Sequence, residues 1–380
     1  MIIEKYNIIK RNLCTICDKN LKNIYKLDNF PIQLSCTKNA VNEVNTLSFS
    51  QCESCYTIQL DNLIPLHILY SNQHNNISIG KLWNNYFKLF CNEIKDNIKN
   101  KNILEIGCPS GKIALNLYNY NKWFIVEPNK NININFNEKI FFIESFFDDN
   151  FNIDEKIDMI IHSHLFEHIY EPNQFLTKCY ELLTPNGEMF FGVPNMEHIG
   201  TNELCPFLGI FFEHTIFLNK ENITFLLKKN KFKIIKIIDY ENHSTLYHCK
   251  KIHNSELVQD IINFKITNYY NIFFDVLDIY KNFINKCNNI IKYNKEVYLF
   301  GASYNTQFLI SLGLNIKNIT GILDNSKEKE NKYLYGYNLK IYNPNILINK
   351  EAIVILKNGY YVNEIYEQVK NINNNIQILI

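Results

Sequence analysis

The stretch 102–111, NILEIGCPSG, decides the fold of this 380-residue chain. Its first five residues read as a buried β-strand, and a turn that contains Gly107 and Gly111 follows directly. Glycines at a strand-to-helix turn let a ligand approach the backbone closely. We expect a helix over about 112–118 to follow this turn.

Strand-like and helix-like stretches alternate from residue 101 onward, which is typical of an α/β protein with a parallel, doubly wound sheet. The further expected strands are 123–126, 140–143, 157–161 and 187–194, with a helix that ends near Leu183. Residues 231–238 and 244–250 suit a final antiparallel pair. The fold class is therefore α/β, with a doubly wound, Rossmann-like domain at the centre of the chain.

Acidic residues accompany the first two strands. Glu105 precedes Gly107 by one residue in the pattern E-x-G-x-x-x-G, and Glu127 ends the second strand. An acidic side chain at the second strand end is placed to bind both hydroxyls of a ribose. A dinucleotide fingerprint would read G-x-G-x-x-G, and its pyrophosphate would be repelled by the carboxylate of Glu105. A ligand with a cationic amino acid would be held by it, so the sequence predicts S-adenosylmethionine.

Four further residues complete the predicted cofactor site. Glu144 and Ser145 follow the third strand, where we expect the adenine side of the ligand. His162 and Ser163 follow the fourth strand.

The N-terminal region contains two Cys-x-x-Cys pairs, Cys14 with Cys17 and Cys52 with Cys55. Two such pairs supply four thiolates at the corners of a tetrahedron, which is the arrangement that structural zinc prefers. Cys36 lies between the pairs and is a candidate for a substitute ligand. The alternatives are reduced core thiols and redox chemistry. A disulfide framework is not expected, because the chain has 11 cysteines and no recognisable export signal.

Composition excludes several classes of protein. The length favours two to three domains, and a formal charge of +1 gives no general attraction to nucleic acid or anionic lipid. No apolar stretch reaches the roughly 18 residues that a membrane span requires. We therefore expect a cytoplasmic protein without nucleic-acid or membrane partners.

The central region resembles the class I methyltransferases. The segments that carry the resemblance are ILEIGCPSG, WFIVEP, HLFEHIYEP, LLTPNGEMFFGVPN and EHTIFLNKENITFLLKKNKFKIIKI, in this order. The resemblance implies methyl transfer from S-adenosylmethionine.

The flanking segments are similar to those of the C-methyltransferases that act on nucleotide-linked ketosugars. Before the central domain, CTIC, FPIQ, CESCYTIQL and LYSN match the order of that family's zinc-binding module. After it, a strand over 296–300, Gly301-Ala302-Ser303, ILDNSKEKE and Gly336 match its C-terminal domain. The resemblance implies a small zinc-binding module (1–75), a methyltransferase domain (76–252), and a helical linker with a C-terminal Rossmann-like α/β domain (253–380). The C-terminal domain would then line the binding site of the substrate's nucleotide, or it would only pack against the other domains.

The resemblance also implies the catalytic residues. Tyr70 matches the tyrosine that borders the family's active site, and Glu213 and His214 match its Glu-His pair. His214 would remove a proton beside a 4-keto group, with Glu213 as its orienting carboxylate or as a substrate contact. Tyr70 would donate a hydrogen bond to the developing enolate oxygen. His168, after the fourth strand, is a second acid/base candidate.

Two positions depart from the family's pattern, with Phe211 in place of a tyrosine and Asn305 in place of a lysine. The site residues also have structural alternatives. Glu213 and His214 could cap the following helix, His168 could hydrogen-bond within its turn, and Tyr70 is one of 24 tyrosines.

Three hypotheses about function follow. The first is C-methylation of a nucleotide-linked keto-deoxysugar through an enolate, a step of carbohydrate biosynthesis. The second is O- or N-methylation of another glycan or small metabolite, which the missing hydroxyl at Phe211 favours somewhat. The third is a binding protein with a vestigial pocket, against which the intact Glu105, Gly107, Gly111 and Glu127 argue. In each case we expect a monomer or homodimer.

Overall fold

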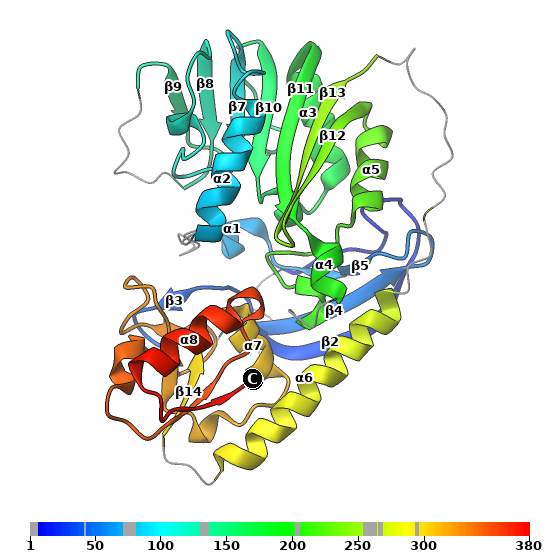
Figure 1. The fold of residues 1–380 in the computed structure, drawn as a ribbon. Coiled ribbons are helices and arrows are strands. Elements are labelled where there is room, and N and C mark those ends of the chain that lie inside the picture. The colour runs from blue at the N-terminus through cyan, green and yellow to red at the C-terminus, as the bar shows by residue number, and fades with distance from the viewer. Residues whose placement is uncertain are drawn as a thin grey trace.

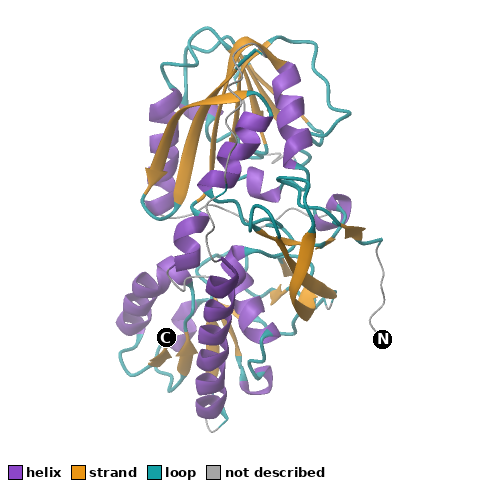
Figure 2. Cartoon of the chain, turned by 90° about the vertical axis from the view of Figure 1, so that its right-hand side faces the viewer, coloured by secondary structure: helices purple, strands orange, loops and turns teal. Residues whose placement is uncertain are grey.

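The computed structural model describes residues 7–41, 43–70, 81–129, 137–201, 206–253, 264, 269–292 and 296–380. Two α/β bodies lie at opposite ends of the molecule, and the N-terminal strands lie between them (Figures 1 and 2). Across the described ranges, the helices include none that is both long and apolar enough to cross a membrane.

A seven-stranded sheet forms the centre of the chain, in the order β12-β13-β11-β10-β7-β8-β9. Its strands are β7 (Asn102–Ile106), β8 (Lys122–Val126), β9 (Ile140–Ile143), β10 (Ile157–Ser163), β11 (Leu183–Pro194), β12 (Phe232–Tyr240) and β13 (Ser244–Lys251). Five neighbouring strands, β11-β10-β7-β8-β9, pair in parallel. The β12–β13 hairpin then pairs antiparallel with β11 through β13. The doubly wound α/β domain expected from the sequence is confirmed.

Helices cover both faces of this sheet, because alternate side chains of a strand point to opposite faces. Helix α2 (Lys81–Ile94) buries Tyr86 and Phe90 in the same core as Ile103 of β7 and Ile161 of β10. Helices α3 (Pro172–Leu182) and α5 (Lys220–Lys229) lie on the other face, where the core contains the neighbouring Leu104 and Ile160.

The prediction of a helix over 112–118 is wrong. The structure has only a single 3₁₀ turn there, Ala114–Asn116, after which Leu117 adopts an extended conformation. Ile113, Ala114, Leu117 and Tyr120 are all buried in the core under α2. An α-helix through Leu117 would carry the chain away from this core, so tertiary packing overrides the local helical preference.

The N-terminal module is a three-stranded antiparallel sheet of β2 (Leu21–Pro31), β4 (Val44–Cys52) and β5 (Ile58–Leu60). The short strands β1 (Ile9–Lys10) and β6 (Asn62–Leu63) pair beside it, and α1 (Leu66–Leu69) leads to Tyr70. Residues 71–75 of the predicted module lie outside the described residues.

The C-terminal domain begins after the long helix α6 (Tyr269–Ile291), which packs with α4 (Met196–Thr201) of the central domain. Its five-stranded parallel sheet has the order β17-β15-β14-β18-β19. The strands are β14 (Val297–Phe300), β15 (Gly321–Leu323), β17 (Ile341–Tyr342), β18 (Ile353–Ile355) and β19 (Gln377–Leu379), and the helices are α7 (Tyr304–Ser311) and α8 (Val362–Ile372). A further strand, β16 (Tyr333–Leu334), pairs with β3 (Cys36–Thr37) and so joins this domain to the N-terminal module.

The buried guanidinium of Arg11 ties the N-terminal module to the central domain. It donates to the carbonyl oxygens of Leu60 (3.1 Å), Tyr170 (2.8 Å) and Thr215 (3.5 Å). Burial lowers the pKa of Arg11 to about 10, with the charge of Glu171 opposing the shift, so the group remains protonated at neutral pH. Backbone hydrogen bonds from Leu60 to Thr215 (2.9 Å) and from Phe217 to Ile58 (2.8 Å) run beside it.

We expect Arg11→Met to lower the free energy of unfolding by about 1.5–3 kcal/mol, because three buried carbonyls lose a charged donor. The neighbouring Lys10 is exposed, so Lys10→Met should change stability by less than about 0.5 kcal/mol. Urea unfolding followed by fluorescence measures both variants. Equal stability of the two would contradict the role of Arg11.

Candidate functional site

Four of the predicted cofactor residues lie near the carboxyl edge of β7 and β8, where ligands bind in open α/β sheets. They are Glu105, Gly107, Gly111 and Glu127. Gly107 takes a φ of 75° and its N–H donates to the carbonyl of Val126 at 3.0 Å. Gly111 takes a φ of 56°. Glu127 follows β8 directly, and its carboxylate accepts the N–H of Asn129 at 3.0 Å. The edge therefore offers an acidic side chain beside a turn whose glycines adopt left-handed conformations.

Glu105 is the buried carboxylate of this edge, with 0% of its surface exposed. One oxygen accepts the indole N–H of Trp123 at 2.8 Å, while Oε1 has no hydrogen-bond partner among the described residues. Burial raises the pKa of Glu105 to about 7, and the hydrogen bond from Trp123 opposes this shift. An orphaned carboxylate oxygen of this kind fits a cationic group, and the α-amino group of S-adenosylmethionine is one.

The four outer cofactor candidates lie in different places. Glu144 and Ser145 follow β9 at the sheet edge, and the Ser145 hydroxyl donates to the carbonyl of Phe146. Ser163 lies on the α2 side, where its hydroxyl meets the Tyr86 hydroxyl at 2.8 Å. His162 points to the other face and stacks on Phe191 at 4.7 Å. Burial lowers its pKa to about 3, so it is a neutral core residue and is not brought to Glu105.

The structure brings Tyr70, His168 and His214 together from three separate segments. The Tyr70 hydroxyl lies 2.9 Å from Nδ1 of His168, across 98 positions of sequence. The rings of His168 and His214 meet edge-on at 4.6 Å. Since the His168 side chain bonds to Tyr70, the alternative that it bonds within its own turn does not hold.

Glu213 belongs to the same site and does not cap a helix. Helix α5 is capped by Asn219, whose side chain accepts the N–H of Asn222 at 2.7 Å. Glu213 is buried and accepts the N–H of Leu34 from the N-terminal module at 3.0 Å. Burial and the charge of His168 lower the pKa of His214 to about 4, although the charges of Glu167 and Glu213 oppose the shift. His214 is therefore neutral at pH 7.

Glu167 lies in the same cluster and is not among the site residues predicted from the sequence. It lies next to His168 in the 3₁₀ turn Phe166–His168 and is 1% exposed. Ligand atoms of Glu167, His168 and His214 all lie within 4.8 Å of one another. Burial raises its pKa, but His164, His168 and His214 outweigh burial and lower it to about 2. The spacing H-x-x-E-H at 164–168 was the signal that could have identified it.

An aromatic wall closes the site toward the C-terminal domain. Phe211, at the position where the resemblance implies a tyrosine, packs on His214 at 4.6 Å and stacks on Tyr304 at 5.0 Å and 9°. Tyr304 opens α7 and is followed by Asn305, which is 7% exposed. Tyr304 thus brings the C-terminal domain next to Phe211, which in turn packs on His214.

The four N-terminal cysteines converge as the sequence predicted. Sγ of Cys14 lies 3.6 Å from that of Cys55, and Sγ of Cys17 lies 3.4 Å from that of Cys52. Tetrahedral zinc with Zn–S bonds of about 2.3 Å holds its sulfurs roughly 3.8 Å apart, so the four thiols suit it. Cys36 is buried in another core, with residues of the C-terminal domain, and is not a substitute ligand.

Both Cys-x-x-Cys turns have the same local geometry. Asp18 and Tyr56, the residues directly after each pair, take φ values of 60° and 58°. Such left-handed residues occupy the place where a glycine is easiest to accommodate. The sulfur of Cys52 accepts the N–H groups of Ser54 and Cys55, each at 3.4 Å. These donors favour the thiolate form that a metal needs.

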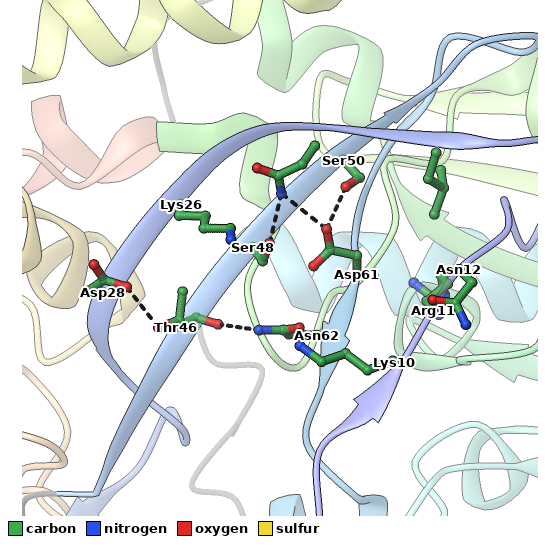
Figure 3. Close-up of a pocket in the computed structure, with 12 residues that line it drawn as sticks. Lys10, Arg11, Asn12, Lys26, Asp28, Thr46, Ser48, Ser50, Asp61 and Asn62 are labelled. Atoms are coloured by element: carbon green, nitrogen blue, oxygen red, sulfur yellow. Dashed lines mark hydrogen bonds between the residues drawn. The ribbon is translucent and has the colours of Figure 1, made fainter. Parts of the chain in front are cut away.

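A polar hollow of about 490 Å³ lies on the N-terminal module, and none of the predicted site residues lines it (Figure 3). Asp61 accepts hydrogen bonds from Asn23 (3.1 Å) and Ser50 (2.6 Å), and Asp28 accepts one from Thr46 (2.8 Å). Its polar groups bond to one another and its charges have both signs, so it presents no selective site.

Two family models match the chain. The model described as "Methyltransferase domain" matches residues 82–237, and that described as "C-methyltransferase C-terminal domain" matches residues 235–380. No curated protein matches the chain by sequence.

Solved structures similar to the chain include the N-methyltransferase NodS from Bradyrhizobium japonicum WM9 in complex with S-adenosyl-L-homocysteine. It is 12% identical, with 46% of this chain and 90% of that chain covered and a TM-score of 0.36. An S-adenosylmethionine-dependent methyltransferase from Mesorhizobium loti is 9% identical, with 45% and 99% covered and a TM-score of 0.36. Similarity at this level does not identify the acceptor.

We expect the affinity for S-adenosylmethionine to rise about tenfold from about pH 6 to about pH 8, because only ionised Glu105 attracts a cation. Its raised pKa centres this titration near neutrality, and the effect is lost as pH falls. Glu105→Gln should bind more weakly and without this pH dependence. Glu155, which pairs with Lys122 on the surface, gives the matched control Glu155→Gln. Calorimetry measures all three proteins, and an unchanged pH profile in Glu105→Gln would contradict the assignment.

Proposed function

We propose that this chain, an S-adenosylmethionine-dependent methyltransferase with a C-methyltransferase C-terminal domain, methylates a carbon atom of a nucleotide-linked keto-deoxysugar. The convergence of Tyr70, His168 and His214 beside two buried carboxylates carries the proposal. Methyl transfer to an amine needs only a positioned lone pair, and transfer to a hydroxyl also needs a base for the released proton. Transfer to carbon needs a base, a donor that stabilises the enolate charge and a water-poor site.

His214 is the base in this proposal. It is neutral at pH 7 and so has a lone pair ready to accept the proton beside the ketone. The C–H bond breaks, its electron pair forms the enolate, and the proton stays on the imidazole. Glu213 and Glu167 stabilise the imidazolium, since the charges of both raise the pKa of His214.

Tyr70 is the donor to the enolate oxygen. Burial raises its pKa well above the ordinary value, so its hydroxyl keeps its proton at neutral pH. Its contact with Nδ1 of His168 fixes the phenol, and His168 can restore the proton if the enolate takes it. The sulfonium methyl of S-adenosylmethionine is the electrophile that the enolate carbon requires.

The substrate's nucleotide would lie toward the C-terminal domain. Phe211 and Tyr304 form an apolar stack between this domain and His214. A flat apolar wall suits a sugar ring or a base, which pack against aromatic faces.

O- or N-methylation of another acceptor is the second candidate. Phe211 favours it, because a phenylalanine there supplies no hydroxyl to an enolate. NMR of the product made from methyl-labelled cofactor with a panel of nucleotide-ketosugars locates the label, and a methyl on oxygen or nitrogen would overturn C-methylation.

We also propose that Cys14, Cys17, Cys52 and Cys55 hold one structural zinc ion. The matched turn geometry and the sulfur separations support it. Four thiolates leave no open position, so the ion would stabilise the module and take no part in methyl transfer.

Replacing His214 by Asn should leave S-adenosylmethionine binding nearly intact and lower turnover by about 10²–10⁴. Exchange of the substrate's α-proton with deuterated water should fall in parallel, because exchange needs the base but no methyl donor. His253 is exposed, and His253→Asn is the matched control. Full exchange in His214→Asn would assign the base to His168 instead.

Protein purified without chelator should contain one zinc ion per chain, and Cys55→Ser should lose it. Cys91 lies outside the cluster, so Cys91→Ser should keep the metal. Removing the metal should increase hydrogen exchange in the N-terminal strands, because metal binding and folding of such modules are coupled. Metal analysis that finds no zinc or iron in the native protein would refute the site.

A further inference from the structure

A chain of polar side chains leads from Glu167 to the turn between β12 and β13. Nδ1 of His164 lies 3.4 Å from Oε1 of Glu167, and its Nε2 lies 3.0 Å from the Ser244 hydroxyl. That hydroxyl lies 2.6 Å from Nδ1 of His243. Ser244 is fully buried and His243 is half-buried, next to the exposed Glu241 and Asn242 of the turn.

The two histidines of this chain are held in place. Trp83 of α2 packs against His164 at 4.7 Å and against His243 at 4.6 Å, in both cases edge to face. His164 also takes a φ of 50°, in the left-handed region that non-glycine residues rarely adopt. Strain of this kind persists where the surrounding structure fixes the residue, and it is common at functional sites.

We propose that Glu167, His164, Ser244 and His243 conduct a proton between the catalytic histidines and solvent. The inference rests on the proposed function, because each C-methylation leaves one proton on the base when the methyl group replaces hydrogen on carbon. The other end of the chain is the cluster of Glu167, His168 and His214, whose ligand atoms lie within 4.8 Å of one another. These groups are close enough to come into hydrogen-bond contact when substrate binds, because catalytic hydrogen bonds often tighten only then.

Each group has the chemistry that such a transfer needs. An imidazole accepts a proton on one nitrogen and releases one from the other, and a hydroxyl donates and accepts at once. Nδ1 of His164 therefore gains a proton beside Glu167 while Nε2 passes one through Ser244 to His243. Glu167 accepts the proton from His214 or His168 and releases it to Nδ1 of His164, so the carboxylate is ionised again once the proton has passed.

The ends of the path explain why the proton would not remain in the site. Burial lowers the pKa of His214 to about 4, so its imidazolium is short-lived. Burial and the charge of His164 lower the pKa of His243 to about 4 as well, so His243 releases the proton to water. His243, Ser244 and His164 act through the catalytic groups and are positioning residues.

Ser244→Ala tests the path, because it removes the hydroxyl and leaves both histidines. Substrate is incubated in deuterated water with S-adenosylhomocysteine, which binds without donating a methyl group, and methylation is measured separately. With the path broken, the base returns the same proton to carbon, so deuterium exchange should fall about 10²-fold. Methylation should fall much less, because the proton can leave with product.

Two further variants give the test its controls. Thr245→Val removes the next hydroxyl along β13, which bonds to Asp239 at 2.9 Å, and should exchange like the wild type. His243→Ala should lose exchange and regain it when imidazole is added to the solution. Equal loss of exchange and methylation in Ser244→Ala, or exchange at the wild-type rate, would overturn the path while leaving C-methylation intact.

Failure of the proposed function is distinguishable, because wild-type protein would then show no exchange and would methylate oxygen or nitrogen. A metal ion bound by Glu167, His168 and His214 would also overturn the path, since it would occupy the nitrogen lone pairs. Metal content lost specifically in Glu167→Gln would reveal it.

Discussion

The guanidinium of Arg11 donates to three carbonyls of the segments that carry Tyr70, His168 and His214. Leu60 precedes the segment that ends in Tyr70, Tyr170 lies two residues after His168, and Thr215 follows His214 directly. All three acceptors are backbone atoms, so the bonds fix the path of the main chain and leave the side chains to chemistry. A buried guanidinium without partners is costly, which couples docking of the N-terminal module to assembly of the site.

Two buried glutamates near neighbouring strand ends have opposite electrostatic environments. Glu105 is desolvated beside an indole N–H, and its pKa rises to about 7. Glu167 is equally buried, but histidines surround it and its pKa falls to about 2. The first suits a site whose cationic ligand arrives and leaves, and the second suits a permanent negative charge beside groups that become imidazolium. Pairs of titratable groups whose pKa values are driven apart in this way are typical of acid–base sites.

The C-terminal domain is attached to the part of the molecule that completes the site. Its strand β16 pairs with β3 of the N-terminal module, and Gln307 of α7 donates to the carbonyls of Gln33 (2.9 Å) and Tyr335 (3.1 Å). Tyr304 opens the same helix and stacks on Phe211. The acid/base cluster therefore has walls from all three modules, which suits an acceptor larger than a simple metabolite.

The sequence by itself determined the strands of the central sheet, the cysteine pairs and the pattern around Glu105, because each depends on residues close together in the chain. Buried parallel strands read as continuous apolar runs, and β7 begins and ends where its run does. The helix expected over 112–118 failed because Leu117 and Tyr120 pack under α2, a contact that no local pattern contains. Only the tertiary structure decided that Tyr70 meets His168, that Glu167 completes the cluster and that Arg11 holds it. The contact between Tyr70 and His168 spans 98 positions of sequence, and that between Arg11 and Tyr170 spans 159. The geometry of both is set by how the N-terminal module docks on the central domain.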